Sequence, residues 1–298
     1  MANTSSESRR FAAVIIITCL SIPTNCHANI HKQVLVFVFG DSLFDPGNNN
    51  YINTTAAFQA NFTPYGESYF YPPTGRFSNG RLMPDFIAEY AGLPPLIPAY
   101  LEPGNNEFTY GANFASAGAG ALIGTRAGFV VGLQTQLRYF GDLEDHYRHN
   151  LGDTKARQLL STAVYLFSCG ANDYLSPVGN NTGIYDKGGR KFGFLNVALL
   201  GCFQAIRVGQ PGNTCNKEMD DIVGDTACCG SGPFRGIFSC GGKRGITEYE
   251  LCDDVTEFFL FDSSHPTELA YRQFAEMFWK GDYMVTAPYN LQALFKNN

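Results

Sequence analysis

Residues 34–43 read VLVFVFGDSL, a run of β-branched and aromatic side chains that ends in Gly-Asp-Ser. A run that is apolar at consecutive positions predicts a strand buried on both faces, as in the centre of a parallel sheet. The glycine predicts a tight turn that leaves Ser42 just beyond the strand. Sites in open parallel sheets form beyond the carboxyl ends of the strands, so this turn is the first candidate site.

The rest of the chain alternates between strand-like and helix-like patterns. Predicted strands lie at residues 164–167, 192–197 and 258–261, and predicted helices at residues 84–90, 133–151, 154–163 and 266–280. Strands that alternate with helices favour a three-layer α/β/α sandwich with a mainly parallel sheet. No linker or repeat interrupts the pattern, so residues 29–298 are predicted to form one domain.

The composition excludes several classes of protein. Only 16% of the 298 residues are charged and the formal net charge is −6. A nucleic-acid-binding protein would normally carry a basic patch or stripe, and none is visible here, so no nucleic-acid partner is expected. No stretch of about 20 apolar residues is present, so we expect no transmembrane span.

The N-terminus resembles a targeting segment. Arg9 and Arg10 precede an apolar run at residues 11–22, and Cys26-His27-Ala28 offers a small-residue cleavage site. This arrangement predicts a secretory signal peptide over residues 1–28 and a secreted, extracellular protein. A buried N-terminal helix is the alternative.

The cysteines fit an oxidising compartment. Six of them lie among Gly, Ser and Pro in the C-terminal half: Cys202, Cys215, Cys228, Cys229, Cys240 and Cys252. We expect them to form disulfides, although six cysteines can pair in fifteen ways and the sequence does not say which. Cys169 lies in an apolar run and is expected to be a buried free thiol. Sequons at Asn53, Asn61 and Asn180 predict N-glycosylation.

A serine nucleophile needs a base, because its free hydroxyl is inert. Among five histidines, His265 has the most suitable surroundings, since Asp262 precedes it by three residues on a predicted strand-to-helix turn. An aspartate at this spacing can accept from Nδ1–H and aim Nε2 outward. The alternative makes Asp262 or Ser264 a helix cap and His265 a surface residue.

Acyl transfer also needs hydrogen-bond donors for an oxyanion, and two glycine-containing blocks are candidates. Residues 111–120 read GANFASAGAG, and their glycines permit close approach of a backbone N–H. Residues 169–173 read CGAND and follow a predicted strand, so that Asn172 can project its amide there. Either block alone also fits an ordinary turn.

Together these blocks resemble the plant-type GDSL esterase/lipase family, also called SGNH hydrolases, over residues 36–279. The matching segments are FGDS at 39–42, TGRFSNGR at 74–81, NFAS at 113–116, GAND at 170–173, CCG at 228–230 and DSSHPT at 262–267. The resemblance implies a flavodoxin-like sandwich and hydrolysis of carboxylic esters through an acyl-enzyme. It implies Ser42 as nucleophile, His265 as base and Asp262 as its orienting group. Ser42 N–H, Gly118 N–H and the Asn172 amide would form the oxyanion hole, and neither a metal nor an organic cofactor is implied.

The sequence departs from the family near residues 216–227. Only twelve residues separate Cys215 from Cys228, where family members carry helices and a further strand. The sheet is therefore expected to lack a strand and covering helices. We expect a secreted esterase or lipase that acts on a small-molecule or lipid ester. The alternatives are an inactive glycoprotein that binds a lipid or cell-wall ligand, and a truncated or wrongly joined chain.

Overall fold

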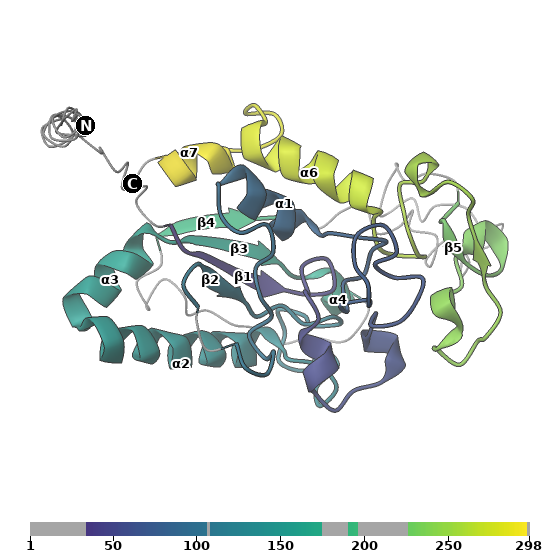
Figure 1. The fold of residues 1–298 in the computed structure, drawn as a ribbon, viewed down its shortest axis with the longest axis horizontal. Coiled ribbons are helices and arrows are strands. Elements are labelled where there is room, and N and C mark those ends of the chain that lie inside the picture. Colours follow the sequence, from purple (N-terminus) through teal and green to yellow (C-terminus); the bar gives the residue numbers. More distant parts are fainter. Residues whose placement is uncertain (1–33, 106–107, 175–189, 196–225, 297–298) are drawn as a thin grey trace, which may run out of the picture. The chain divides into compact units, whose positions relative to one another are not determined.

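The run that ends at Gly40 forms the central strand of a parallel sheet in the computed structural model (Figure 1), which describes residues 34–105, 108–174, 190–195 and 226–296. Strand β1 (Val36–Gly40) is buried throughout and pairs with β2 (Gly111–Asn113) on one side and β3 (Val164–Ser168) on the other. Strand β4 (Lys191–Phe194) pairs with β3. The order β2-β1-β3-β4, with all pairs parallel, is that of the first four strands of a flavodoxin-like sheet.

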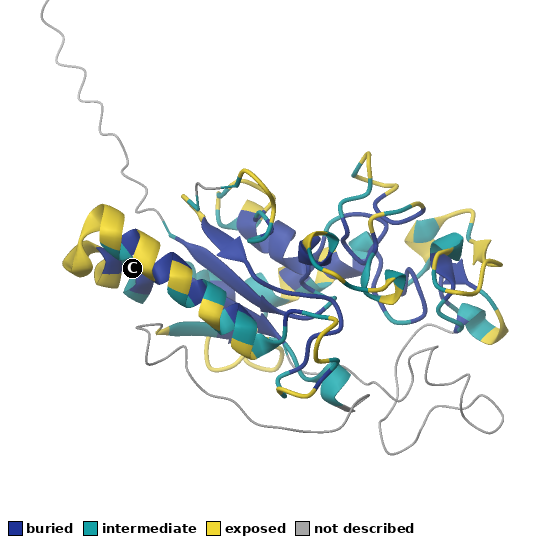
Figure 2. Cartoon of the chain, turned by 90° about the horizontal axis from the view of Figure 1, so that it is seen from below, coloured by how far each residue is buried: buried dark blue, intermediate teal, exposed yellow. Residues whose placement is uncertain are grey.

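Two helical layers cover the sheet because alternate side chains of each strand point to opposite faces. Phe37 and Phe39 pack with α2 (Leu133–Leu151) and α3 (Asp153–Thr162). Val36 and Val38 face the other layer. That layer contains α1 (Met83–Tyr90), α6 (Glu268–Lys280) and α7 (Leu291–Lys296). Figure 2 shows the buried sheet between helices whose outer faces are exposed. The predicted three-layer sandwich is confirmed.

The prediction of a strand at residues 258–261 is wrong. A 3₁₀ turn at Val255–Glu257 precedes this segment, and only an isolated bridge between Leu260 and Pro266 forms there. The carbonyls of Leu260 and Phe261 instead accept from Cys228 N–H and Cys229 N–H. Cys229 begins β5 (Cys229–Gly230), which pairs with β6 (Glu250–Leu251) in a separate small sheet. An apolar run does not distinguish a sheet strand from a buried irregular segment.

Several other boundaries differ from the predictions. Helix α6 begins at Glu268 rather than at residue 266, because Thr267 caps it by accepting from Ala270 N–H. Strand β2 was not predicted, since three residues that begin with glycine carry no periodic signal. The remaining short elements are α4 (Ala171–Tyr174) and 3₁₀ turns at Asn48–Tyr51, Ala56–Phe58, Pro233–Arg235 and Cys240–Gly242.

Two disulfides tie together the segment that follows residue 226. Cys228 bonds to Cys252, and its neighbour Cys229 bonds to Cys240. Cys202 and Cys215 lie outside the described residues. Cys169 is free, as predicted, but it is half-buried rather than buried.

The predicted signal peptide at residues 1–28 lies outside the described part of the chain and stays a prediction. No helix within the described ranges is long and apolar enough to cross a membrane.

Candidate active site

The end of β1 is a backbone turn that requires glycine. Gly40 has a φ of 144°, and a Cβ there would lie 2.0 Å from the carbonyl oxygen of Ser168 on β3. Asp41 N–H donates to that same oxygen at 3.0 Å. Gln136 of α2 is fully buried, and it accepts from Gly40 N–H at 2.9 Å and donates to Gly40 O at 2.8 Å. Hydrogen bonds to β3 in the sheet and to α2 in the helical layer therefore fix the backbone of the turn that presents Ser42.

Ser42, His265 and Asp262 form one hydrogen-bonded chain. The Oγ atom of Ser42 lies 2.8 Å from Nε2 of His265. On the other side of the ring, Nδ1 lies 2.7 Å from Oδ1 and 2.8 Å from Oδ2 of Asp262. The structure thus brings together three residues that come from opposite ends of the sequence. The helix-cap alternative for Asp262 does not hold, because Thr267 caps α6.

Asp262 is fully buried, yet its surroundings favour the charged carboxylate. Oδ1 accepts from the backbone N–H groups of Ser264 and His265, both at 2.9 Å. Oδ2 accepts from the hydroxyl of Tyr65 at 2.6 Å. Burial alone would raise the pKa of Asp262, but attraction to His265, the hydrogen bonds and the nearby Arg244 outweigh it, and the pKa is lowered.

Tyr65 and Arg244 were not found by sequence reasoning. Burial, followed by the neighbouring Asp262 charge, raises the pKa of Tyr65 well above its ordinary value, so its hydroxyl stays protonated as a donor. The Arg244 guanidinium lies 5.0 Å from the Tyr65 ring centre and donates to the carbonyls of Cys240 and Gln59. No motif marks either residue, because Tyr65 is 197 residues from Asp262 and Arg244 is 185 residues from Gln59.

The turn that carries Ser42 has its own buried carboxylate in Asp41. Its Oδ1 accepts from Leu43 N–H at 3.1 Å and from the Ser168 hydroxyl at 3.4 Å. Desolvation outweighs these bonds and the attraction of His265, and it raises the pKa of Asp41 to about 7.

The glycine-rich block runs beside this turn. Ser116 N–H donates to Gly40 O at 3.0 Å, and Gly118 follows with a φ of 85°. Within the described residues, neither Ser42 N–H nor Gly118 N–H donates to another protein group. Both are the backbone donors that the family resemblance implies, and both remain available for a bound oxyanion.

Asn172 lies at the same place, on α4 after β3. Its Nδ2 donates to Ala119 O at 3.0 Å, one residue beyond Gly118. The neighbouring Asp173 accepts from Ala121 N–H and from the Thr125 hydroxyl. These bonds join α4 to the segment that directly follows the glycine-rich block. An amide nitrogen carries two hydrogens, so one remains for a ligand.

Comparison with known proteins agrees with this geometry. The family model described as GDSL-like Lipase/Acylhydrolase matches residues 36–278. The chain belongs to the GDSL lipase/acylhydrolase family. It is 54% identical, over an alignment 354 positions long, to "GDSL lipase" from Tanacetum cinerariifolium, with 97% of this chain and 95% of that protein covered. It is 41% identical over 381 residues to "GDSL esterase/lipase 1" from Arabidopsis thaliana, with both chains covered completely.

Membership of this family makes the chain a carboxylic ester hydrolase and supports its plant origin. Both alignments are longer than the 298 residues of the chain, so these GDSL relatives carry segments that it lacks. The predicted deletion near residues 216–227 is consistent with this shortfall, although residues 216–225 lie outside the described ranges. Among the described strands, none pairs with β4 on its free side.

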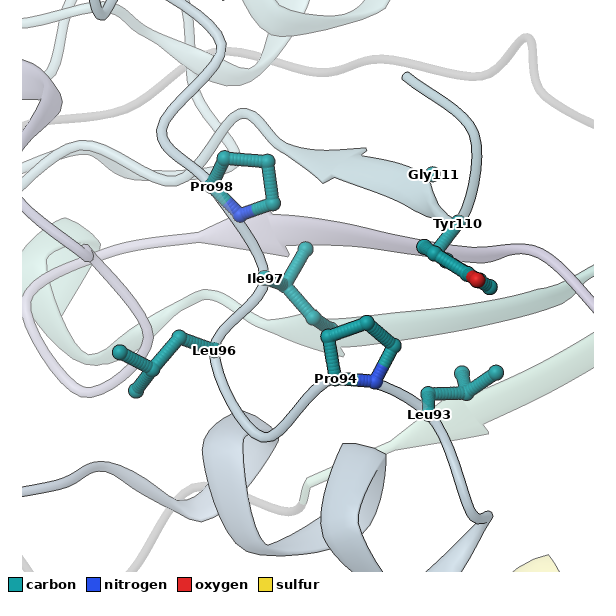
Figure 3. Close-up of a pocket in the computed structure, with 7 residues that line it drawn as sticks. All are labelled: Leu93, Pro94, Leu96, Ile97, Pro98, Tyr110 and Gly111. Atoms are coloured by element: carbon teal, nitrogen blue, oxygen red, sulfur yellow. The ribbon is translucent and has the colours of Figure 1, made fainter. Parts of the chain in front are cut away.

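Ser42 lines neither of two open pockets of this GDSL-family chain. One, of about 100 Å³, is formed mainly by apolar residues of the segment before β2, with Tyr110 across from Pro94 (Figure 3). It adjoins Gly111, which pairs with the first residue of β1, and so it lies at the opposite end of the sheet from Ser42. The other, of about 360 Å³, is partly lined by Arg81, by Glu268 at the start of α6 and by Arg272.

The remaining predicted sites concern modification and metals. Asn53 and Asn61 are exposed, as glycosylation requires, and Asn180 lies outside the described residues. No group of three His, Cys, Asp or Glu side chains that could hold a metal ion occurs in the part of the chain that the structure describes.

Proposed function

We propose that the protein is a secreted serine esterase or lipase that hydrolyses carboxylic esters through an acyl-enzyme on Ser42. The observation that carries this proposal is the chain of hydrogen bonds from Ser42 Oγ through His265 to Asp262, with Oγ 2.8 Å from Nε2. A hydroxyl in hydrogen-bond reach of an oriented imidazole is the arrangement of an activated serine nucleophile.

The reaction follows from the position of each group. Nε2 of His265 takes the proton from Ser42 as Oγ attacks the ester carbonyl carbon. The carbonyl oxygen becomes an oxyanion that accepts from Ser42 N–H, Gly118 N–H and Asn172 Nδ2. The tetrahedral intermediate then expels the alcohol, which receives its proton from His265 and leaves an acyl group on Oγ. A water molecule, deprotonated by His265, releases the acid by the reverse sequence.

Asp262 keeps His265 in the tautomer that presents an unprotonated Nε2 to Ser42. Its lowered pKa means that the carboxylate is charged over the neutral pH range and stabilises the imidazolium formed in each step. We propose secretion on the basis of residues 1–28 and the disulfides, which form in oxidising compartments. A small-molecule or lipid ester is the proposed substrate class, in keeping with the names of the relatives.

A fluorophosphonate probe tests the proposal directly. We expect the purified mature protein to be labelled at Ser42, which mass spectrometry of the adduct peptide identifies. Ser42→Ala should remove both the labelling and the hydrolysis of 4-nitrophenyl butyrate. A folded wild-type protein that is not labelled, but still binds a lipid or cell-wall ligand, would instead establish the inactive glycoprotein.

A further inference from the structure

The peptide unit that carries Gly118 N–H is held by a side chain from outside the glycine-rich block. The carbonyl oxygen of the same unit belongs to Ala117, and Asn49 Nδ2 donates to it at 2.9 Å. The two groups of a trans peptide lie in one plane and point in opposite directions. A hydrogen bond on Ala117 O therefore also sets the direction of Gly118 N–H.

The amide of Asn49 is itself fixed in orientation. Asn49 is 1% exposed, and its Nδ2 also donates to Phe58 O at 2.8 Å. Its Oδ1 accepts from the hydroxyl of Ser116, and that hydroxyl accepts from Val131 N–H at 2.9 Å. Both hydrogens of Nδ2 and the oxygen Oδ1 are thus hydrogen-bonded, and rotation of the side chain would break these three bonds.

The same network reaches the nucleophile turn. Gln136 Nε2 donates both to Val131 O at 2.7 Å and to Gly40 O at 2.8 Å. Buried hydrogen bonds thus run from Gly40, two residues before Ser42, through Gln136, Val131, Ser116 and Asn49 to the Ala117–Gly118 peptide. They connect the backbone of the nucleophile turn to the second backbone donor of the oxyanion hole.

We propose that Asn49 is a positioning residue that aims Gly118 N–H at the oxyanion. The proposal rests on the proposed function, because it presupposes that Ser42 attacks an ester carbonyl. Donors that are already aimed at the place where charge develops stabilise the transition state without reorganisation. Asn49 does not touch the reacting atoms, and it acts only through the peptide that it holds.

The adjacent Asn50 provides a matched control. Its Nδ2 donates to a backbone carbonyl as well, Thr74 O at 2.7 Å, but that peptide carries no proposed donor. Asn49→Asp and Asn50→Asp each replace an amide donor that faces a carbonyl oxygen with a carboxylate oxygen. Ser116→Ala is a milder third variant, since it leaves Asn49 in place and removes the hydroxyl that orients its amide.

Two readouts separate positioning from a structural contribution: the kcat and KM for 4-nitrophenyl butyrate, and the inhibition constant of a phenylboronic acid. The boronic acid forms a tetrahedral adduct on serine and so reports on the oxyanion hole. Loss of one oxyanion donor costs about 10²–10³ in kcat, and for a misaimed donor we expect a fall of about 10- to 100-fold in Asn49→Asp. KM should stay within about 2-fold of wild type, and the inhibition constant should rise by the factor by which kcat/KM falls.

We expect kcat to fall less in Ser116→Ala, with an inhibition constant that again rises by the factor by which kcat/KM falls. In Asn50→Asp, both kcat and the inhibition constant should stay close to the wild-type values. Equal losses of kcat in the two Asp variants, or a fall in kcat without weaker boronic acid binding, would overturn the proposal. If circular dichroism shows that Asn49→Asp is unfolded, Ser116→Ala decides by the same two readouts. An unlabelled wild-type Ser42 would overturn the proposed function itself, and this inference with it.

Discussion

The two turns that meet at the active site are built in different ways. The Ser42 turn extends from a central strand, and Ser168 of β3 and Gln136 of α2 hold its backbone. The Asp262 turn follows no strand. Its preceding residues accept from Cys228 and Cys229, which belong to the disulfide-bonded segment, and Tyr65 packs against Phe261 with ring centres 5.4 Å apart. Ser42 is thus positioned by the sheet, and the Asp262 turn is hydrogen-bonded to the disulfide-bonded segment.

Each turn buries an aspartate, and the two respond to burial in opposite ways. Asp41 has few donors, so desolvation raises its pKa to about 7. Asp262 receives hydrogen bonds from two backbone N–H groups, from His265 and from Tyr65, and its pKa is lowered. The attraction of His265, together with the hydrogen bonds and the nearby Arg244, therefore keeps the buried carboxylate of Asp262 charged.

Asp262→Asn should have the largest effect, on catalysis. An asparagine can accept from Nδ1–H, but it lacks the negative charge that stabilises the imidazolium. The corresponding change in a serine protease lowers kcat about 10⁴-fold. We expect a fall of that order for 4-nitrophenyl butyrate, measured on protein that circular dichroism shows to be folded. A loss of less than tenfold would mean that Asp262 only stabilises the turn.

Asp41→Asn should change how stability depends on pH. The raised pKa means that the folded state binds a proton more tightly than the unfolded state, whose pKa is near 3.8. The folded protein therefore loses stability as pH rises from about 4 to about 7, by about 4 kcal/mol for this group, and Asn removes that loss. Urea unfolding at pH 4.5 and pH 8 should show a difference between variant and wild type that grows with pH. A difference that is the same at both pH values would show that Asp41 ionises normally.

Sequence patterns predicted those features of the two turns that depend on residues close together in the chain. The apolar run before Gly40 predicted a strand, and β1 confirms it. Asp262 and His265 are three residues apart, and the carboxylate lies within hydrogen-bond distance of Nδ1 as this spacing predicted. Long-range partners had no such signal. Tyr65 reaches Asp262 across a separation of 197 residues, and Asn49 reaches Ala117 across 68.

The wrong strand at residues 258–261 has a related cause. Phe258 and Phe261 pack in the disulfide-linked core with Cys228 and Phe77, and not in the parallel sheet. A hydrophobic run predicts that a segment is buried. Whether the segment forms a strand depends on its contacts with distant parts of the chain.

Removal of the Cys229–Cys240 disulfide should affect the two turns unequally. A crosslink that closes a loop of this length contributes about 3 kcal/mol. In Cys229→Ala/Cys240→Ala, we expect faster amide exchange over residues 227–262 and unchanged protection in β1 and β3, because the sheet does not depend on this segment. Cys169→Ala is the control, since this free thiol closes no loop. Uniform loss of protection would show that the two halves unfold together.

Tyr65→Phe should give the smallest effect, and Tyr165→Phe is its counterpart in the sheet. Both hydroxyls are buried, but Tyr65 donates to the Asp262 carboxylate at 2.6 Å and Tyr165 to the neutral carbonyl of Leu160 at 2.9 Å. Hydrogen bonds to charged groups contribute about 1.5–3 kcal/mol and neutral ones about 1 kcal/mol. Urea unfolding at pH 7 should therefore show the larger loss in Tyr65→Phe.

Measuring the loss of unfolding free energy in Tyr65→Phe at several pH values tests whether it comes from the hydrogen bond to the charged Asp262. The lowered pKa of Asp262 gives stability that is present above about pH 4 and lost as pH falls through the folded-state pKa. Without the Tyr65 hydroxyl, the carboxylate of Asp262 is less stabilised, so the gap between Tyr65→Phe and wild type should shrink at low pH. The gap for Tyr165→Phe should stay constant, because its partner does not titrate. Equal behaviour of the two variants would mean that the Tyr65 hydroxyl does not contribute to the charge state of Asp262.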